Sequence, residues 1–202
     1  MDTASLISFS IFAFVSAFTP GPNNIMLAAS GANFGLRKTM PHIMGICAGF
    51  LSMVIAASFG LTTMFQAIPE LVFIFKIAGG MFIVYLAWKI AIALPPEERP
   101  KLGKPLNFTE AALFQLINPK AVVVVISAIS TYSSASSTPV QTSILIFTIF
   151  AFVTVTSTIL WGYGGELLGR LLKKRTHFKI FNASMACILL ITLLPIITNN
   201  LS

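Results

Sequence analysis

The feature that most constrains this chain is a succession of long apolar stretches separated by short polar breaks. Six stretches can be traced, at about residues 5–30, 40–64, 71–94, 108–131, 141–165 and 178–198. A helix of about 20 apolar residues is long enough to cross the hydrocarbon core of a bilayer. Backbone exposed to lipid must also satisfy its own hydrogen bonds, which favours helices. The pattern therefore predicts an all-α membrane protein with six transmembrane helices.

The composition agrees with a membrane protein and argues against a soluble one. Of the 202 residues, 56% are hydrophobic and only 9% are charged, whereas soluble domains usually carry about a quarter charged residues. The net charge of +7 would also suit a nucleic-acid-binding protein, but the basic residues fall in short clusters between apolar stretches. We therefore expect a lipid bilayer, and no nucleic acid, as the partner.

The basic residues predict an orientation, because Lys and Arg in short loops mark the cytoplasmic side. Eleven of the 13 lie in or beside the first, third and fifth breaks, and none lies in the other two breaks or at the termini. No Lys or Arg precedes Arg37, so the first stretch is expected to be a retained helix rather than a cleaved signal peptide. These observations predict a multi-pass protein of the cell inner membrane with both termini in the periplasm.

The third break is the longest and most polar, and it divides the chain into two sets of three spans. We expect a single transmembrane domain over residues 1–202, made of a first repeat at about 1–95, a cytoplasmic linker at about 95–106 and a second repeat at about 107–202. Span 1 would run inward and span 4 outward. The two sets would therefore be an inverted repeat.

Spans 1 and 4 are each interrupted by proline next to asparagine. The first interruption reads Thr19-Pro20-Gly21-Pro22-Asn23-Asn24 and the second Asn118-Pro119-Lys120. Both lie roughly 16 to 22 Å into their spans at 1.5 Å per residue, which is near the membrane interior. Proline disrupts a helix interior but suits its first position after an N-cap residue. Thr19-Pro20 and Asn118-Pro119 therefore predict two helices that restart inside the membrane.

A helix that restarts there directs free N–H groups and a partial positive charge at whatever fills the space, and a carboxylate suits it. The carbonyl groups before each break and the amide oxygens of Asn23, Asn24 and Asn118 can accept from an ammonium group. Paired discontinuous helices are typical of transporter sites. Gln115 shares a helix face with Asn118. The predicted substrate-binding residues are Thr19, Pro20, Gly21, Pro22, Asn23, Asn24, Gln115, Asn118, Pro119 and Lys120.

Lys120 places a charge among apolar residues, where it is costly unless it faces a cavity. It would serve there as a carboxylate counter-ion or as a titrating group. The alternative is a side chain that extends to the membrane surface. Proline and asparagine can also be simple kinks, but two breaks at matching positions favour a function. The hydroxyl cluster Thr154, Thr156, Ser157 and Thr158 either lines a pore or bonds helix to helix.

Other classes of function receive less support from the residues. Cys47 and Cys187 share no ligand spacing with each other or with the two histidines, so no metal, disulfide or other cofactor is expected. No constellation of nucleophile and base indicates an enzyme. A transporter or channel for another solute or ion, or a non-transporting scaffold, remains an alternative. No acidic residue lies deep in a span, so proton coupling would need Lys120, a residue nearer a span end, or the substrate itself.

Three motifs resemble those of the lysine-exporter (LysE/RhtB) family of bacterial amino-acid exporters. They are TPGPNN at residues 19–24, FQLINPK at residues 114–120, and the stretch 79–89 that ends in YLAWK. The resemblance implies export of amino acids or their derivatives, driven by the membrane gradient rather than by ATP. The residues of these motifs are most similar to those of exporters of cysteine and O-acetylserine, with homoserine and threonine exporters close behind. The sequence does not decide the substrate, the coupling ion or whether a homo-oligomer forms.

Overall fold

The computed structural model describes residues 1–61, 69–92, 104–132, 139–171 and 175–191. These residues form eight α-helices and one π-helical turn, and no β-strand occurs among them. The prediction of an all-α protein is therefore confirmed. Apart from its last three residues, the predicted linker at 95–106 lies outside the described residues.

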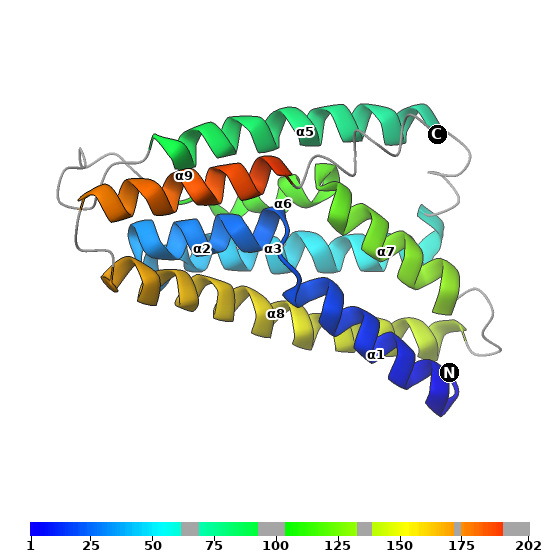
Figure 1. Ribbon diagram of the computed structural model, residues 1–202. Coiled ribbons are helices and arrows are strands. Elements are labelled where there is room, and N and C mark those ends of the chain that lie inside the picture. The colour runs from blue at the N-terminus through cyan, green and yellow to red at the C-terminus, as the bar shows by residue number, and fades with distance from the viewer. Residues whose placement is uncertain (62–68, 93–103, 133–138, 172–174, 192–202) are drawn as a thin grey trace.

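The helices lie side by side in one bundle (Figure 1). The first half of the chain contains α1 (Thr3–Phe18), α2 (Pro22–Phe34), α3 (Leu36–Ala56), the π-helical turn η1 (Ala57–Leu61) and α5 (Pro69–Ala91). The second half contains α6 (Phe108–Ile117), α7 (Pro119–Tyr132), α8 (Pro139–Leu171) and α9 (Arg175–Ile191). The pairs α1–α2 and α6–α7 each form one bent rod, with angles of 47° and 63° between their members.

Among the described residues, two helices are long and apolar enough to cross a membrane unaided, Leu36–Phe59 and Val140–Leu171. Counting each bent pair as one span raises the number to four. The apolar stretches found in α5 and α9 are shorter, at Met81–Ala91 and Thr176–Ile191. Length and composition thus support the predicted spans 1, 2, 4 and 5. Spans 3 and 6 and the inverted repeat stay predictions.

Both breaks occur in the predicted motifs, but the first helix restarts later than predicted. Thr19 is the C-cap of α1, and α2 begins at Pro22 with Gly21 as its N-cap. Proline disfavours the helical conformation of the residue that precedes it. Thr19 and Gly21 both precede proline and are both extended, with ψ of 138° and 176°. The predicted start at Thr19-Pro20 is therefore wrong, whereas the start of α7 at Asn118-Pro119 is confirmed.

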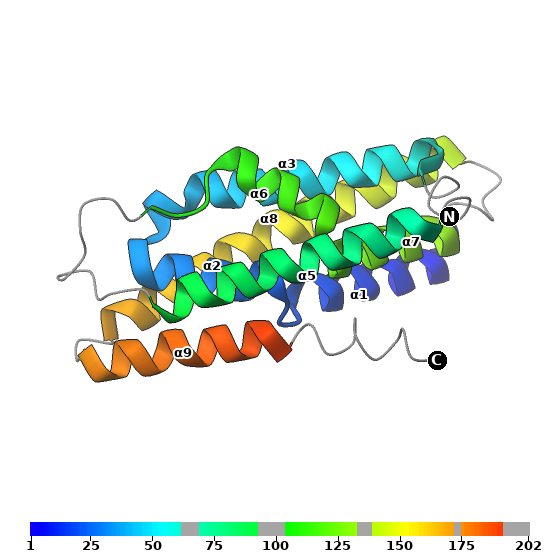
Figure 2. The same ribbon diagram turned by 90° about the horizontal axis from the view of Figure 1, so that it is seen from above.

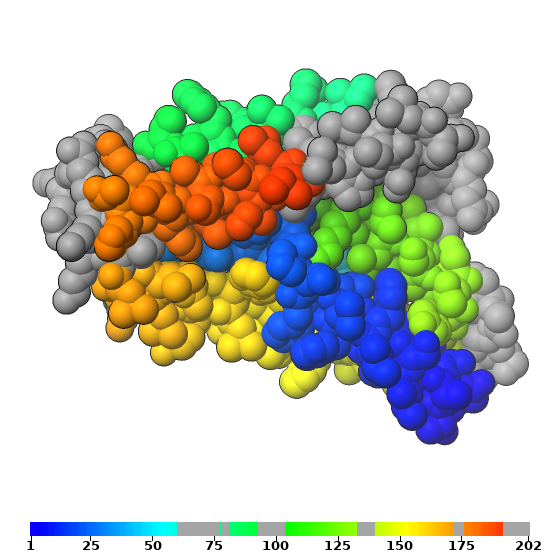
Figure 3. Space-filling model, in the orientation of Figure 1, coloured from blue at the N-terminus to red at the C-terminus, as the bar shows by residue number. Residues whose placement is uncertain are grey.

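α2 is a buried helix, because 11 of its 13 residues are buried. Only a narrow strip of it is visible between α8 and α9 (Figure 3). Its contact with α8 depends on glycine: a Cβ atom at Gly165 would lie 2.1 Å from the carbonyl oxygen of Ala28, and one at Gly31 would lie 2.0 Å from that of Gly162. No side chain fits in this space, so the two backbones are in direct contact.

α3 and α6 pack in the same way and lie side by side (Figure 2). A Cβ atom at Gly45 would lie 2.3 Å from the carbonyl oxygen of Phe108, and one at Gly49 would lie 2.5 Å from that of Ala112. This close approach holds α6, and the break that follows it, against α3.

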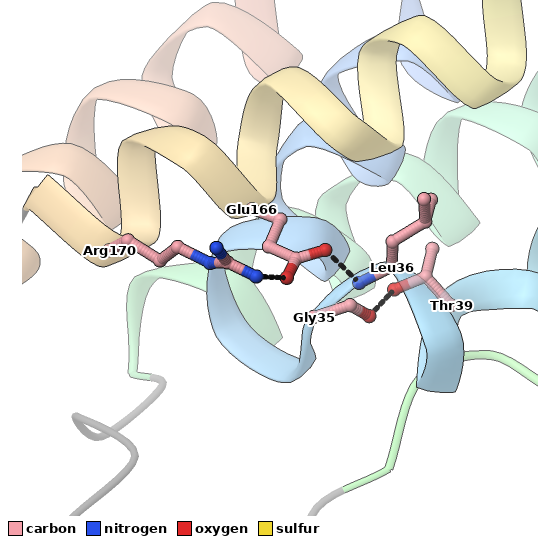
Figure 4. Close-up of polar contacts among 5 residues, drawn as sticks. All are labelled: Gly35, Leu36, Thr39, Glu166 and Arg170. Carbon is pink, nitrogen blue, oxygen red and sulfur yellow. Dashed lines mark hydrogen bonds and ion pairs between the residues drawn. The ribbon is translucent and has the colours of Figure 1, made fainter.

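The tight turn between α2 and α3 is attached to the end of α8 (Figure 4). Gly35 has a φ of 79°, which favours glycine. The Glu166 carboxylate accepts a hydrogen bond of 2.9 Å from the Leu36 N–H and forms an ion pair of 2.6 Å with Arg170. The Thr39 hydroxyl donates to the Gly35 carbonyl at 2.9 Å. A carboxylate at the N-terminus of α3 is favourable. Hydrogen bonds to the backbone and one ion pair therefore stabilise this end of the bundle.

Candidate functional site

The first break leaves carbonyl groups at the end of α1 without a helical hydrogen-bond partner, and side chains from three other helices donate to them. Asn24 of α2 donates to the carbonyls of Ala17, at 2.7 Å, and Thr19, at 2.9 Å. Ser157 of α8 donates to Ala17 at 2.7 Å. The Lys120 Nζ of α7 donates to Thr19 at 2.8 Å. Helix-end carbonyls need such partners away from water, and the protein supplies them here with its own donors.

A pair of amide side chains joins the two breaks. The Asn23 Nδ2 donates to Gln115 Oε1 at 2.7 Å, and the Gln115 Nε2 donates back to Asn23 Oδ1 at 3.2 Å. Gln115 is fully buried and also donates to the Ala111 carbonyl at 2.9 Å. Its contacts make Gln115 a residue that positions Asn23.

At the second break, Asn118 ends α6 and begins α7. Its own N–H donates to the Gln115 carbonyl at 3.3 Å, and its carbonyl accepts from the Val122 N–H at 3.0 Å. Its side-chain oxygen accepts from the Lys120 N–H at 3.2 Å. The side chain is 1% exposed. Asn118 therefore acts as the N-cap of a helix that starts inside the bundle.

We expect Asn118→Ala to destabilise the start of α7 by about 1 kcal/mol, the usual cost of losing an N-cap. The orientation of Lys120 should change with it, and the unfolding temperature of the purified protein in detergent should fall. Asn118→Ser is the matched control, because serine can cap the helix at the same position. An unfolding temperature that falls equally in both variants would contradict a capping role.

A cavity lies between the two breaks. Five of the ten predicted site residues line it: Gly21, Asn23, Asn24, Asn118 and Lys120. The other five, Thr19, Pro20, Pro22, Gln115 and Pro119, are not among its lining residues. Its remaining polar lining consists of Ser16, Thr154, Ser157 and Thr158.

The charge in this cavity is positive, because Lys120 is the one charged residue among those that line it. The first turn of α2 adds to it. Among the described residues, the backbone N–H groups of Asn23 and Asn24 have no hydrogen-bond acceptor. Free N–H groups at a helix start attract anions. The arrangement is compatible with the carboxylate site that the sequence predicts, and substrate binding there stays a prediction.

Acceptors for an ammonium group are less available than the sequence predicted. The carbonyls of Ala17 and Thr19 already accept from protein donors. The side-chain oxygens of Asn23 and Asn118 do so too. Of the predicted acceptors, the side-chain oxygen of Asn24 accepts no hydrogen bond from the described residues, so it stays available for an ammonium group.

Aromatic side chains form the apolar wall of the cavity. Phe50 and Phe150 line it and meet edge to face with their ring centroids 5.2 Å apart. Phe9 packs edge to face on Phe150 at 5.1 Å. These three rings belong to a buried cluster of α1, α3, α7 and α8. They lie between the cavity and the end of the bundle where α1 begins.

Apolar helices around a partly polar cavity, with two interrupted helices meeting at it, are typical of the class of membrane transporters. Comparison with known proteins agrees with this class. Residues 14–195 match the family described as LysE type translocator. The chain belongs to this family, which confirms the resemblance in the three motifs.

Several curated relatives are efflux proteins. The cysteine/O-acetylserine efflux proteins of Escherichia coli strain K12 and of Shigella sonnei strain Ss046 are each 28% identical to this chain over 175 residues. The alignment covers 86% of this chain and 89% of each relative. No solved structure matches the chain.

Proposed function

We propose that this protein is a secondary exporter of small zwitterionic amino acids, of the cysteine/O-acetylserine, homoserine or threonine class, and that it binds them between the two breaks. The observation that carries this proposal is the polar cavity at which both breaks meet, with Lys120 reaching from one break to the other. The names of the curated relatives favour cysteine and O-acetylserine within this class.

The hydrogen bond between Lys120 and Thr19 suggests how such a substrate is bound. An incoming carboxylate would pair with the Lys120 ammonium and with the free N–H groups of Asn23 and Asn24. This would draw Lys120 off the Thr19 carbonyl, which then accepts from the ammonium group of the substrate. Both ends of the zwitterion gain a partner in this exchange, and no buried group of the protein loses one.

For the arrangement in the membrane, we propose six spans in one inner-membrane domain, as two inverted repeats with both termini in the periplasm. Two bent pairs in corresponding places, α1–α2 and α6–α7, support the repeat. The positions of the basic residues support the orientation. In this arrangement the aromatic cluster of Phe9, Phe50 and Phe150 would lie on the periplasmic side of the cavity.

The direct test offers a panel of radiolabelled amino acids to everted membrane vesicles that contain the protein. We expect these vesicles to take up more O-acetylserine, homoserine, threonine or, under reducing conditions, cysteine than vesicles without the protein do. Lysine and arginine should not be taken up, because the positive cavity repels a second cationic group. If no amino acid is transported and another solute or an ion is, the proposed function is wrong.

A further inference from the structure

His42 is a buried side chain without a partner. It lies in α3 with 1% of its surface exposed, and neither of its ring nitrogens has a hydrogen-bond partner. Buried polar side chains are nearly always hydrogen-bonded, and a neutral imidazole carries one donor and one acceptor. A histidine that serves only packing is expected to have at least one of these bonded. The burial of His42 therefore needs another explanation.

The helix register places His42 close to the cavity. Gly45, Ile46 and Gly49 follow it at positions three, four and seven along α3 and so share its face. Ile46 lines the cavity, and a Cβ atom at Gly49 would lie 2.8 Å from the Gln115 side chain. His42 is thus one helical turn from the cavity. It lies on the side of Arg37 and Lys38, whose charges predict the cytoplasmic face.

The carboxyl groups that commonly carry protons through membranes are missing from this region. The chain has six acidic residues. Asp2 caps α1, Glu70 is in the first turn of α5, and Glu110 is in the first turn of α6. Glu166 binds Leu36 and Arg170, and no acidic residue lines the cavity. Glu97 and Glu98 lie outside the described residues.

No other titratable group pairs with His42. The elements that pack against α3 are α2, α6, α7, α8 and η1, and α2 and η1 carry no charged residue. The titratable groups on the others and on α3 itself are Arg37, Lys38, Cys47, Glu110, Lys120, Tyr132, Tyr163, Glu166 and Arg170. None of these donates to or accepts from the imidazole. His42 is therefore free to gain or lose a proton without breaking a hydrogen bond or an ion pair.

We propose that His42 binds the proton whose inward movement drives amino-acid export, an inference that rests on the proposed function. A histidine exposed to water titrates near neutral pH, and ionisable side chains inside a membrane protein commonly relay protons. A proton from the periplasmic side binds a ring nitrogen of His42 when the cavity opens outward. It leaves to cytoplasmic water after the substrate has departed and the cavity faces inward. One N–H bond forms and the same bond breaks, so the imidazole is unchanged after each cycle.

The test separates exchange of substrate from uphill transport. Proteoliposomes with the wild-type protein, His42→Gln or His177→Gln are loaded with unlabelled cysteine under reducing conditions and given labelled cysteine at equal pH, which measures exchange. A pH gradient then measures accumulation against a concentration gradient. His177 is the second of the two histidines and is exposed at the start of α9, so His177→Gln is the matched control.

We expect H42Q to exchange cysteine at a rate close to that of the wild-type protein but to lose roughly ten-fold or more of the accumulation driven by the pH gradient. The H177Q variant should retain both. Exchange by the wild-type protein should vary with pH, and this variation should disappear in H42Q.

Three results would overturn the proposal. Accumulation by H42Q at the wild-type level would show that the proton binds elsewhere. Loss of exchange together with accumulation would place His42 in the substrate path. Proton movement is measured with a pH-sensitive dye inside the vesicles, which needs no variant. Transport of cysteine by the wild-type protein without proton movement would also exclude a proton-binding role for His42. These results differ from the result expected if the proposed function itself is wrong, because the wild-type protein would then exchange no amino acid.

Discussion

Replacing Lys120 with methionine is expected to lower amino-acid efflux roughly ten- to a hundred-fold, the range expected for the loss of a hydrogen bond to a charged group. The amount of protein in the membrane should stay the same. Lys120 is the one charged residue that lines the cavity, and its ammonium group donates to the Thr19 carbonyl at 2.8 Å. Methionine has a similar length but no charge. A substrate carboxylate would therefore lose its counter-ion while the shape of the cavity is largely kept.

The control for this variant is Lys89→Met. Lys89 is an exposed lysine in the last turn of α5, with its ammonium 5.1 Å from the centre of the Tyr85 ring. Both variants remove one positive charge, so a general effect of charge on membrane insertion would appear in both. Export by K120M at the level of K89M would exclude Lys120 as a substrate ligand. Export is measured as the release of labelled amino acid from preloaded cells, normalised to the protein detected in the membrane.

Gly21 offers a second way to move Lys120 without removing it. A Cβ atom at Gly21 would lie 2.8 Å from Lys120 Cδ and 3.0 Å from its Nζ. The lysine is flexible, so Gly21→Ala should displace it rather than unfold the protein, and efflux should fall. If the effect acts through Lys120, adding G21A to K120M should change efflux no further. A large additional loss in the double variant would mean that Gly21 acts independently of Lys120.

The breaks could be predicted from the sequence because proline acts locally. It removes an N–H group and restricts the residue before it, wherever the chain lies in the fold. The same rule, applied to both prolines of the first motif, would have placed the start of α2 at Pro22. With Pro20 alone considered, the predicted start fell two residues early. The deeper prediction, that the two breaks come together, relied on their matching positions in two halves of the chain.

Other parts of the site depend on which helices become neighbours, and the sequence contains no local signal for that. Gln115 was grouped with Asn118 by helix periodicity, but its amide binds Asn23, 92 residues away in the chain. Ser157 belongs to a hydroxyl cluster for which two roles were open, and the structure supports both. It binds the Ala17 carbonyl and lines the cavity. His42 attracted no functional interpretation because its lack of a partner is visible only in three dimensions.

The α2–α8 contact gives the last and strongest prediction, in which two neighbouring glycines respond oppositely to the same change. A Cβ atom at Gly165 would lie 2.1 Å from the Ala28 carbonyl oxygen and 2.7 Å from two further Ala28 backbone atoms, whereas one at Gly164 would meet no atom within 4 Å. Backbone cannot move aside as a flexible side chain can. Gly165→Ala therefore has to push α2 away from α8, at a cost of about 3 kcal/mol, the upper part of the range for overpacked cores.

The consequence reaches the cavity, because α2 carries Asn23 and Asn24 at its first turn and α8 supplies Ser157. We expect G165A to yield much less monodisperse protein after detergent extraction, to unfold at a clearly lower temperature and to lose efflux. Gly164→Ala should behave like the wild-type protein or slightly better, by about 0.5–1 kcal/mol, since alanine favours a helix over glycine. Equal stability of the two variants would mean that α2 and α8 do not approach each other as closely as described. The hydrogen bonds from Asn24 and Ser157 to the carbonyl groups at the end of α1 depend on that close contact, so they would then not form as described.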